Sequence, residues 1–169
     1  MSELEKIRKH VEAIISRFQN EERDLFDVNA SERSLTHKLA EHFQRNKAFA
    51  GYSVDCEYNR WGEKGKTIPF RRKTMKSDDE CPPTVYPDII IHTRRIQENN
   101  LLVIEVKKDR NPQKDTFDRQ KLAYFTSSEC RYQYRFGLFL RFYMDGKTAP
   151  DIAWYENGEP AKTELRAEA

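Results

Sequence analysis

The sequence lacks the features of disulfide-rich, membrane-spanning and strongly charged proteins. It has three cysteines, Cys56, Cys81 and Cys130, and an odd number at wide spacing does not suit a disulfide framework or a zinc site. No apolar run approaches the roughly 20 residues of a membrane helix, and the charged residues 1–10 do not resemble a signal peptide. The net charge of +2 is too small to indicate nucleic-acid binding by itself. We therefore expect a soluble, cytoplasmic protein with free thiols.

The apolar residues gather in short runs, which favours a folded protein although 34% of the residues are charged. A chain of 169 residues is long enough for a single domain with a real core. Helical spacing and start signals predict three helices, over 3–19, from Asn29 or Ser31 to about 47, and over about 111–127. Alternating or continuous apolar runs predict five strands, over 52–58, 85–92, 101–107, 135–143 and 152–155. This order predicts an α/β protein with a mixed central sheet flanked by helices and its last strand at an edge.

Three further segments have less defined roles. The helix over 3–19 has one apolar face, which packs on the core or, alternatively, forms a homodimer contact. Residues 20–27 are expected to be a polar break. Residues 59–83 form a long basic insertion, in which 67–70 is a candidate for a brief strand. A loop of this length in a compact domain is usually functional or disordered.

Charged residues lie in two apolar strands, where charge is normally excluded. Asp88 heads the strand over 85–92, and Glu105 and Lys107 lie near the end of the strand over 101–107. Because side chains alternate along a strand, Glu105 and Lys107 point to the same side, and Asp88 can reach them from the neighbouring strand. Buried charges are costly unless they are paired or bind a metal. Two carboxylates with water and phosphate oxygens suit Mg²⁺, so the sequence predicts a divalent-cation site here.

Pro87-Asp88 followed by Glu105-Val106-Lys107 resembles the signature of the PD-(D/E)xK nuclease superfamily, which includes restriction enzymes, Holliday-junction resolvases and RecB-like exonucleases. The order of elements over about 29–143 also resembles its αβββαβ core, to which the first helix is an addition. The resemblance implies a restriction-endonuclease-like fold and a deoxyribonuclease that depends on Mg²⁺ or Mn²⁺, with Asp88 and Glu105 as metal ligands. Lys107 then orients or deprotonates the attacking water, or holds the scissile phosphate, and a nearby dication lowers its pKa.

The resemblance extends to the helices before and after these strands. Many members carry a glutamate at the start of the first core helix that helps bind the metal, and Glu32 is at the corresponding place. RecB-like members carry a Gln-x-x-x-Tyr motif on the helix after the lysine strand, which Gln120 and Tyr124 match. The resemblance therefore implies Glu32 as a further metal ligand. It also implies that Gln120 and Tyr124 orient the substrate phosphate or the lysine.

Each of these residues also has a structural interpretation without catalysis. These are a turn cap for Asp88, an ion pair for Glu105, a solvated strand end for Lys107, the third position of a capping box begun by Asn29 for Glu32, and helix packing for Gln120 and Tyr124. Histidines are expected to be structural as well. His92 is interpreted as a hydrogen-bonded residue at a strand end, and His37 and His42 as residues of a helix surface.

Lysine and arginine dominate residues 64–76, which contain no acid. Basic loops beside a nuclease site usually track phosphates, so four residues are expected to contact DNA: Arg71, Arg72, Lys73 and Lys76. Trp61 or Phe70 could stack on a base. The alternatives are a solvated loop, an RNA substrate, which the motif does not exclude, and a catalytically silent nuclease-fold subunit that binds DNA or protein in a defence or repair complex.

Overall fold

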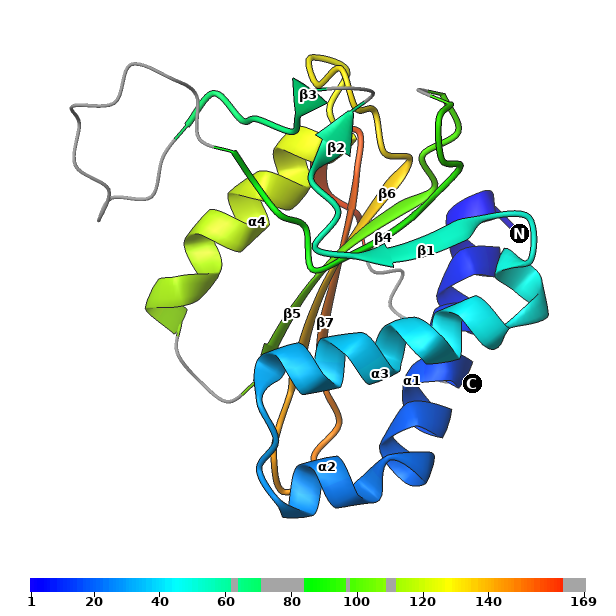
Figure 1. Cartoon of the computed structure of the whole chain (residues 1–169), viewed down its shortest axis with the longest axis vertical. Helices are drawn as coiled ribbons and strands as arrows, with labels where there is room; N and C mark the ends of the chain where they lie inside the picture. Colours follow the sequence, from blue (N-terminus) through cyan, green and yellow to red (C-terminus); the bar gives the residue numbers. More distant parts are fainter. Residues whose placement is uncertain (62–63, 71–83, 97, 109–111, 163–169) are drawn as a thin grey trace.

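The computed structural model describes residues 1–61, 64–70, 84–96, 98–108 and 112–162; at 61 and 112–114 it describes the backbone alone. A six-stranded sheet with helices on both faces dominates this part of the chain (Figure 1). Its strands are β1 Ser53–Cys56, β4 Ile89–His92, β5 Leu102–Lys108, β6 Phe136–Phe142, β7 Asp151–Glu156 and β8 Glu159–Pro160. A separate two-stranded antiparallel sheet pairs β2 Arg60–Trp61 with β3 Lys64–Gly65.

The six strands lie in the order β1-β4-β5-β6-β7-β8 and form a mixed sheet. β5 and β6 are parallel, and each of the other neighbouring pairs is antiparallel. Parallel neighbours need a crossover connection, which the helix α4 Pro112–Thr126 supplies. The prediction of an α/β protein with a mixed sheet flanked by helices is therefore confirmed.

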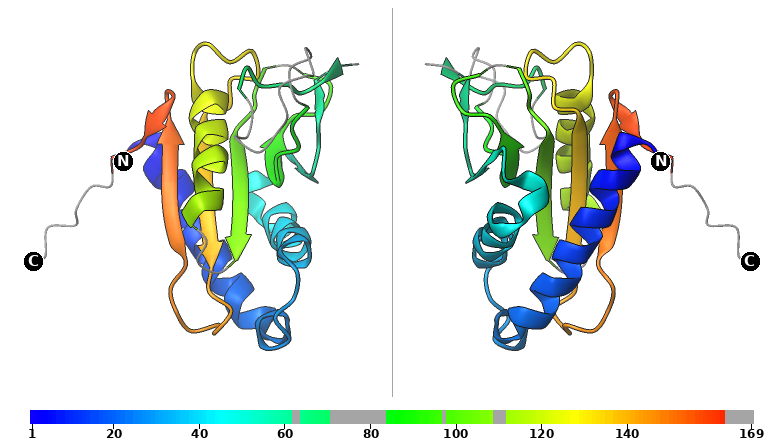
Figure 2. Two further views of the ribbon diagram at one scale, coloured as in Figure 1. Left: turned by 90° about the vertical axis from the view of Figure 1, so that its left-hand side faces the viewer. Right: turned by 90° about the vertical axis from the view of Figure 1, so that its right-hand side faces the viewer.

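Each face of the sheet packs against its own helices. Ile104 of β5 belongs to the core under α1 Glu3–Glu21 and α3 Glu32–Arg45, whereas Val103 belongs to a second core with Leu122 of α4. Figure 2 shows α1 and α4 on opposite sides of the sheet. Because side chains alternate along a strand, Glu105 and Lys107 share the face of Val103 and point towards α4.

The first helix packs on the core, as the first of its two interpretations expects. It begins after Ser2, whose side chain forms a capping box with Glu5. Its apolar stripe includes Val11 and Phe18, both fully buried in the same core as α3 and the sheet. The apolar face of α1 is thus covered within the chain itself.

Residues 23–27 form a short helix, α2 Arg23–Asp27, so the prediction of a polar break is wrong over this segment. Phe26 anchors the helix because its buried ring lies 5.8 Å from Phe18 and 5.7 Å from Phe142, measured between ring centroids. One buried residue in a helix of five leaves no 3.6-residue periodicity, and periodicity is the signal on which helix prediction depends.

The start of α3 fixes where Glu32 lies. The Oγ of Ser31 accepts a hydrogen bond from the Ser34 N–H at 3.1 Å, so Ser31 is the cap. Asn29 has a φ of 50° and lies in the turn before the cap. Glu32 is therefore the first helical residue, and the capping box begun by Asn29 is wrong.

Several strand boundaries also differ from the predictions. β4 begins at Ile89, so residues 85–88 precede the strand. β7 is not the last strand, because the two-residue β8 pairs with its final residues, Tyr155 and Glu156, and takes the edge of the sheet there. The brief strand expected over 67–70 is reduced to one bridge between Thr67 and Thr84. Of these differences, the late start of β4 has the largest consequence for the candidate site.

Candidate functional site

The candidate site lies beside the last residues of β5, which extend past the first residue of β4. The two strands pair at Ile89 and Ile104, and β5 continues for four residues beyond that pair. On this side of β5, two carboxylates take the place of the missing strand. The Val106 N–H donates to Asp88 Oδ2 at 2.7 Å, and the Lys108 N–H donates to Glu32 Oε2 at 3.2 Å. The backbone of β5 thus fixes the two acids side by side.

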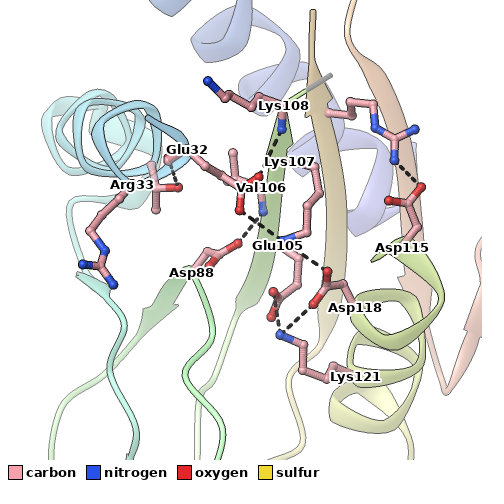
Figure 3. Close-up of polar contacts among 12 residues, drawn as sticks. Glu32, Arg33, Asp88, Glu105, Val106, Lys107, Lys108, Asp115, Asp118 and Lys121 are labelled. Atoms are coloured by element: carbon pink, nitrogen blue, oxygen red, sulfur yellow. Dashed lines mark hydrogen bonds and ion pairs between the residues drawn. The ribbon is translucent and has the colours of Figure 1, made fainter. Parts of the chain in front are cut away.

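Lys107 lies between acids from the two sides of the sheet. Its Nζ is 3.3 Å from Glu32 Oε1 of α3 and 3.2 Å from Asp118 Oδ2 of α4 (Figure 3). Burial by itself would lower the pKa of the Lys107 ammonium, but the surrounding carboxylates, Asp118 foremost, raise it overall. In the protein alone, the pKa of Lys107 is therefore shifted opposite to the lowering expected beside a dication.

Glu105 is the single acid of β5 and is deeply buried, with 1% of its surface exposed. Its Oε2 lies 2.7 Å from Lys121 Nζ, which in turn lies 3.0 Å from Asp118 Oδ1. The other oxygen, Oε1, is buried and has no hydrogen-bond partner among the described residues. Burial, opposed by Lys121 and reinforced by repulsion from Asp88 and Asp118, raises the pKa of Glu105 to about 8.

These side chains form what we call the acid–lysine cluster: Glu32, Asp88, Glu105, Asp118, Lys107 and Lys121. Within the described residues, four carboxylates meet two ammonium groups in it, so the ionised cluster has excess negative charge. Burial also raises the pKa of Asp88, although Lys107 and the Val106 N–H oppose the shift. Excess acid with a buried oxygen lacking a partner fits the chemistry of an oxygen-ligated dication.

The carboxylates are not gathered into a ready cage. No three His, Cys, Asp or Glu side chains in the described residues stand close enough together to hold a metal ion by themselves. Lys107 and Lys121 occupy the space between the acids. Mg²⁺, however, is usually held by one or two carboxylates together with water and substrate phosphates, so Asp88 and Glu105 would be sufficient protein ligands.

A groove gives solvent access to the cluster from the side of α3. It has a volume of about 630 Å³ and lies between the first two turns of α3 and the end of β1. Its lining residues are Ser31, Glu32, Arg33, Thr36, His37, Cys56, Glu57 and Asp88. Glu32 and Asp88 therefore face a space that a substrate could enter, whereas Glu105, Asp118 and Lys121 do not line the groove and are buried between β5 and α4.

The structure brings Glu32, Asp88, Glu105 and Lys107 together, but it places Gln120 and Tyr124 elsewhere on α4. Gln120 is exposed to solvent. Tyr124 is half-buried, with its ring 5.9 Å from that of Phe70. The side of α4 that meets the cluster carries Asp118 and Lys121 instead. The assignment of phosphate orientation to Gln120 and Tyr124 remains a prediction.

Asp118 and Lys121 are not among the site residues that the sequence predicts, although it contains a signal for them. They precede Leu122 and Phe125 at the spacings of one helix face, and all four are buried. Two charged residues within a buried helical stripe indicate a polar partner on the sheet beneath it. The partners are Glu105 and Lys107, two residues apart on β5.

The remaining sequence-predicted contacts have mixed outcomes. Arg71, Arg72, Lys73 and Lys76 lie outside the described residues, as does the side chain of Trp61. Phe70 packs on Phe117 at 5.9 Å between ring centroids. Cys56 and Cys130 are free, and Cys81 is outside the described residues.

The structural interpretations are confirmed for His92 and His37 and wrong for His42. His92 Nε2 lies 2.8 Å from Asp55 Oδ2, as expected for a hydrogen-bonded histidine at a strand end. His37 is on the exposed surface of α3, also as expected. His42 is buried, with Nε2 3.3 Å from Glu22 Oε1, so its assignment to the helix surface is wrong.

Comparisons of the chain with protein-family models, curated proteins and solved structures find no match. Among the described residues, no helix has the length and apolar character required to span a bilayer. Any functional assignment therefore depends on the geometry and chemistry of the acid–lysine cluster.

Proposed function

We propose that the protein is a divalent-metal-dependent nuclease that hydrolyses phosphodiester bonds in DNA, with a restriction-endonuclease-like core. The observation that carries this proposal is the acid–lysine cluster at the point where β4 and β5 separate. The PD-(D/E)xK pattern comes together there in space, with Asp88, Glu105 and Lys107 joined by Glu32. An isolated strand-end acid or lysine would not need such neighbours.

In the proposed site, Asp88 and Glu105 hold Mg²⁺ or Mn²⁺ and Glu32 assists. Bound metal would lower the pKa of a water ligand and stabilise charge on the phosphate in the transition state. Oε1 of Glu105 is the buried acceptor still lacking a partner, and Asp88 faces the groove. Glu32 divides its two oxygens between the Lys107 ammonium and the Lys108 N–H.

Lys107 has the role of a cation that holds the phosphate or the attacking water. Its raised pKa keeps the ammonium protonated near neutral pH when no metal is present. A protonated lysine donates hydrogen bonds and neutralises charge, but it cannot accept a proton from water. In the metal-free protein, the charge of Lys107 therefore suits two of the three roles left open by the sequence, orientation of the water and binding of the phosphate.

The proposal is tested by a cleavage panel of single-stranded, double-stranded, nicked and branched DNA and of RNA, each with Mn²⁺ or with EDTA. We expect cutting of at least one DNA substrate with Mn²⁺ and none with EDTA. Lys107→Ala should abolish cutting while the protein remains folded, as judged by circular dichroism. Full activity of Lys107→Ala would overturn the mechanism, and cleavage of RNA alone would overturn the choice of DNA.

A second candidate, a nuclease-fold subunit that binds DNA or protein without cutting, is the alternative to test. Its support is that no ready-made metal cage exists among the described residues. Calorimetric titration with Mn²⁺ separates the two candidates. Absence of Mn²⁺ binding together with salt-sensitive DNA binding would favour the binding subunit, because phosphate contacts weaken as salt increases.

A further inference from the structure

We propose that Asp118 and Lys121 of α4 are positioning residues of the candidate site. Lys121 holds one oxygen of Glu105 so that the other is left for a divalent cation, and Asp118 fixes the Lys107 ammonium. This inference deepens the proposed function and rests on it. Neither residue belongs to the PD-(D/E)xK pattern or to the Gln-x-x-x-Tyr pair.

Lys121 has the geometry of a clamp on Glu105. Its ammonium donates to Glu105 Oε2 at 2.7 Å, and the residue is 5% exposed. A carboxylate held at one oxygen by a buried donor has lost most of its rotational freedom. Oε1, which lacks a hydrogen-bond partner in the described part of the chain, is then held in one direction. Hydrogen bonds of this kind commonly orient metal-ligating carboxylates.

Asp118 links the clamp to the lysine of β5. Its Oδ1 lies 3.0 Å from Lys121 Nζ and its Oδ2 lies 3.2 Å from Lys107 Nζ. Only 1% of Asp118 is exposed, so both ion pairs are shielded from solvent. One carboxylate thereby sets the distance between two ammonium groups that would otherwise repel each other (Figure 3).

A purely structural role, in which these charges fasten α4 to the sheet, explains the arrangement less well. Leu122 and Phe125 already pack α4 on the sheet and are fully buried. Nearer the start of α4, Asp115 pairs with Arg141 of β6, which supplies an ionic link between the same two layers. Buried ion pairs add little stability over apolar residues of similar size, so fastening alone gives no reason for Asp118 and Lys121.

The decisive experiment measures Mn²⁺ affinity by calorimetry in the full-length protein and in Lys121→Met, which keeps a side chain of similar length. Loss of a positioning residue should weaken Mn²⁺ binding by at least about tenfold. The sign is diagnostic, because removing a positive charge near a cation site would by itself tighten binding. Tighter or unchanged Mn²⁺ binding in folded Lys121→Met would overturn the proposal.

Two further variants control for charge and for folding. Arg119→Met removes a positive charge from the same helix, where the guanidinium stacks 4.1 Å from the Phe139 ring centroid, and it should leave Mn²⁺ affinity within about twofold. Lys121→Arg keeps the charge and should recover most of the affinity lost in Lys121→Met. If Lys121→Met does not fold, Lys121→Gln takes its place in the same titration.

Asp118→Asn tests the other half of the inference. Because Asp118 orients Lys107 and is not proposed as a metal ligand, we expect kcat to fall by at least about tenfold while KM and Mn²⁺ affinity stay within about threefold. Wild-type kcat in Asp118→Asn would overturn its positioning role. Wild-type protein that binds Mn²⁺ without cutting would refute the nuclease proposal alone, whereas wild-type protein without Mn²⁺ binding would overturn both.

Discussion

The two ends of β4 carry charged clusters in which the balance of acidic and basic groups is opposite. At its start, Asp88 belongs to the acid–lysine cluster, where four carboxylates meet two lysines among the described residues. At its end, His92 and Arg94 both bind the single carboxylate of Asp55. We call the residues at this second end the His92 cluster: Asp55, Tyr58, Lys66, His92 and Arg94.

The His92 cluster is more closed, because the Asp55 carboxylate, the His92 ring and the Lys66 ammonium each contact another member of it. His92 Nε2 lies 2.8 Å from Asp55 Oδ2, and the centroid of the His92 ring lies 5.1 Å from that of the Tyr58 ring. Lys66 is 1% exposed and donates to the Tyr58 carbonyl at 3.1 Å, with its ammonium 4.8 Å from the Tyr58 ring. Nothing in this arrangement requires an external ion.

The difference shows how one strand can support a structural cluster at one end and a candidate site at the other. A carboxylate that is matched by its neighbours stabilises the fold. Burial, reinforced by the neighbouring carboxylates, raises the pKa of Glu105, and perturbed pKa values of this kind are characteristic of functional sites. Variants at the first end should therefore change activity, whereas variants at the second end should change stability.

The largest effect is expected for Asp88→Asn at the first end. The amide oxygen can still accept from the Val106 N–H, but the charge that would bind the metal is gone. Metal stabilisation of a transition state contributes several kcal/mol, so the rate of DNA cleavage should fall by about 10²- to 10⁴-fold. Initial rates in Mn²⁺ and unfolding in urea measure the two properties, and the free energy of unfolding should change little.

Asp55→Asn is the matched control for this variant, since it makes the same chemical change at the other end of β4. Its cleavage rate should remain close to wild type. If Asp88→Asn cut DNA at the wild-type rate, or if the two variants lost activity equally, the contrast between the ends would disappear.

The next largest effect is a loss of stability in Asp55→Ala. The change leaves buried His92 and exposed Arg94 without their shared acceptor. Hydrogen bonds to charged groups contribute about 1.5–3 kcal/mol, so the free energy of unfolding should fall by about 2 kcal/mol. Urea denaturation measures this loss, and calorimetry should give an Mn²⁺ affinity equal to that of wild type. A stable Asp55→Ala protein with weakened Mn²⁺ binding would reverse the assignment of roles.

The sequence predicted much of the acid–lysine cluster at the start of β4. Of the His92 cluster it predicted only the hydrogen-bonded histidine at the strand end. Asp88, Glu105 and Lys107 could be grouped because strand alternation is a local rule, and neighbouring strands bring their residues together. The sequence could not show that β4 begins only at Ile89, because strand ends depend on pairing between distant segments. The backbone bond from Val106 to Asp88 follows from that ending.

The helix after β5 shows a second limit. Resemblance to a known motif directed attention to Gln120 and Tyr124, whereas the structure turns Asp118 and Lys121 towards the sheet. Gln120 is two residues after Asp118, which is about 200° around a helix. Which face of α4 meets the sheet depends on how Leu122 and Phe125 pack. The sequence indicates such a tertiary contact only weakly when charged residues interrupt the apolar stripe of the helix.

A smaller effect of opposite sign is expected at Lys66. Burial lowers the pKa of its ammonium to about 8, although Asp55 opposes the shift. The folded protein therefore binds fewer protons than the unfolded chain between about pH 8 and the ordinary lysine pKa. The loss of folding stability that this causes reaches its full size below about pH 8. Lys66→Met should raise the free energy of unfolding at neutral pH by about 1 kcal/mol.

Urea denaturation at about pH 7 and about pH 10 checks this prediction. The gain in Lys66→Met should shrink at the higher pH, where wild-type Lys66 is increasingly neutral in the folded protein. A less stable Lys66→Met protein at neutral pH would mean that the contacts with Tyr58 outweigh the cost of burying the charge.

The smallest effect concerns the pH dependence that His92 contributes. Burial lowers the pKa of His92, and the hydrogen bond to Asp55 only partly opposes the shift. Just below the ordinary histidine pKa the unfolded chain therefore binds more protons than the folded protein, so stability falls as the pH decreases through about 6.5. In His92→Gln, whose amide can still donate to Asp55, this loss should be absent.

Urea denaturation of both proteins between about pH 7 and pH 5 isolates the difference, because the other histidines are common to them. Parallel stability curves would show that His92 keeps an ordinary pKa, and the second end of β4 would then be less closed than its geometry indicates.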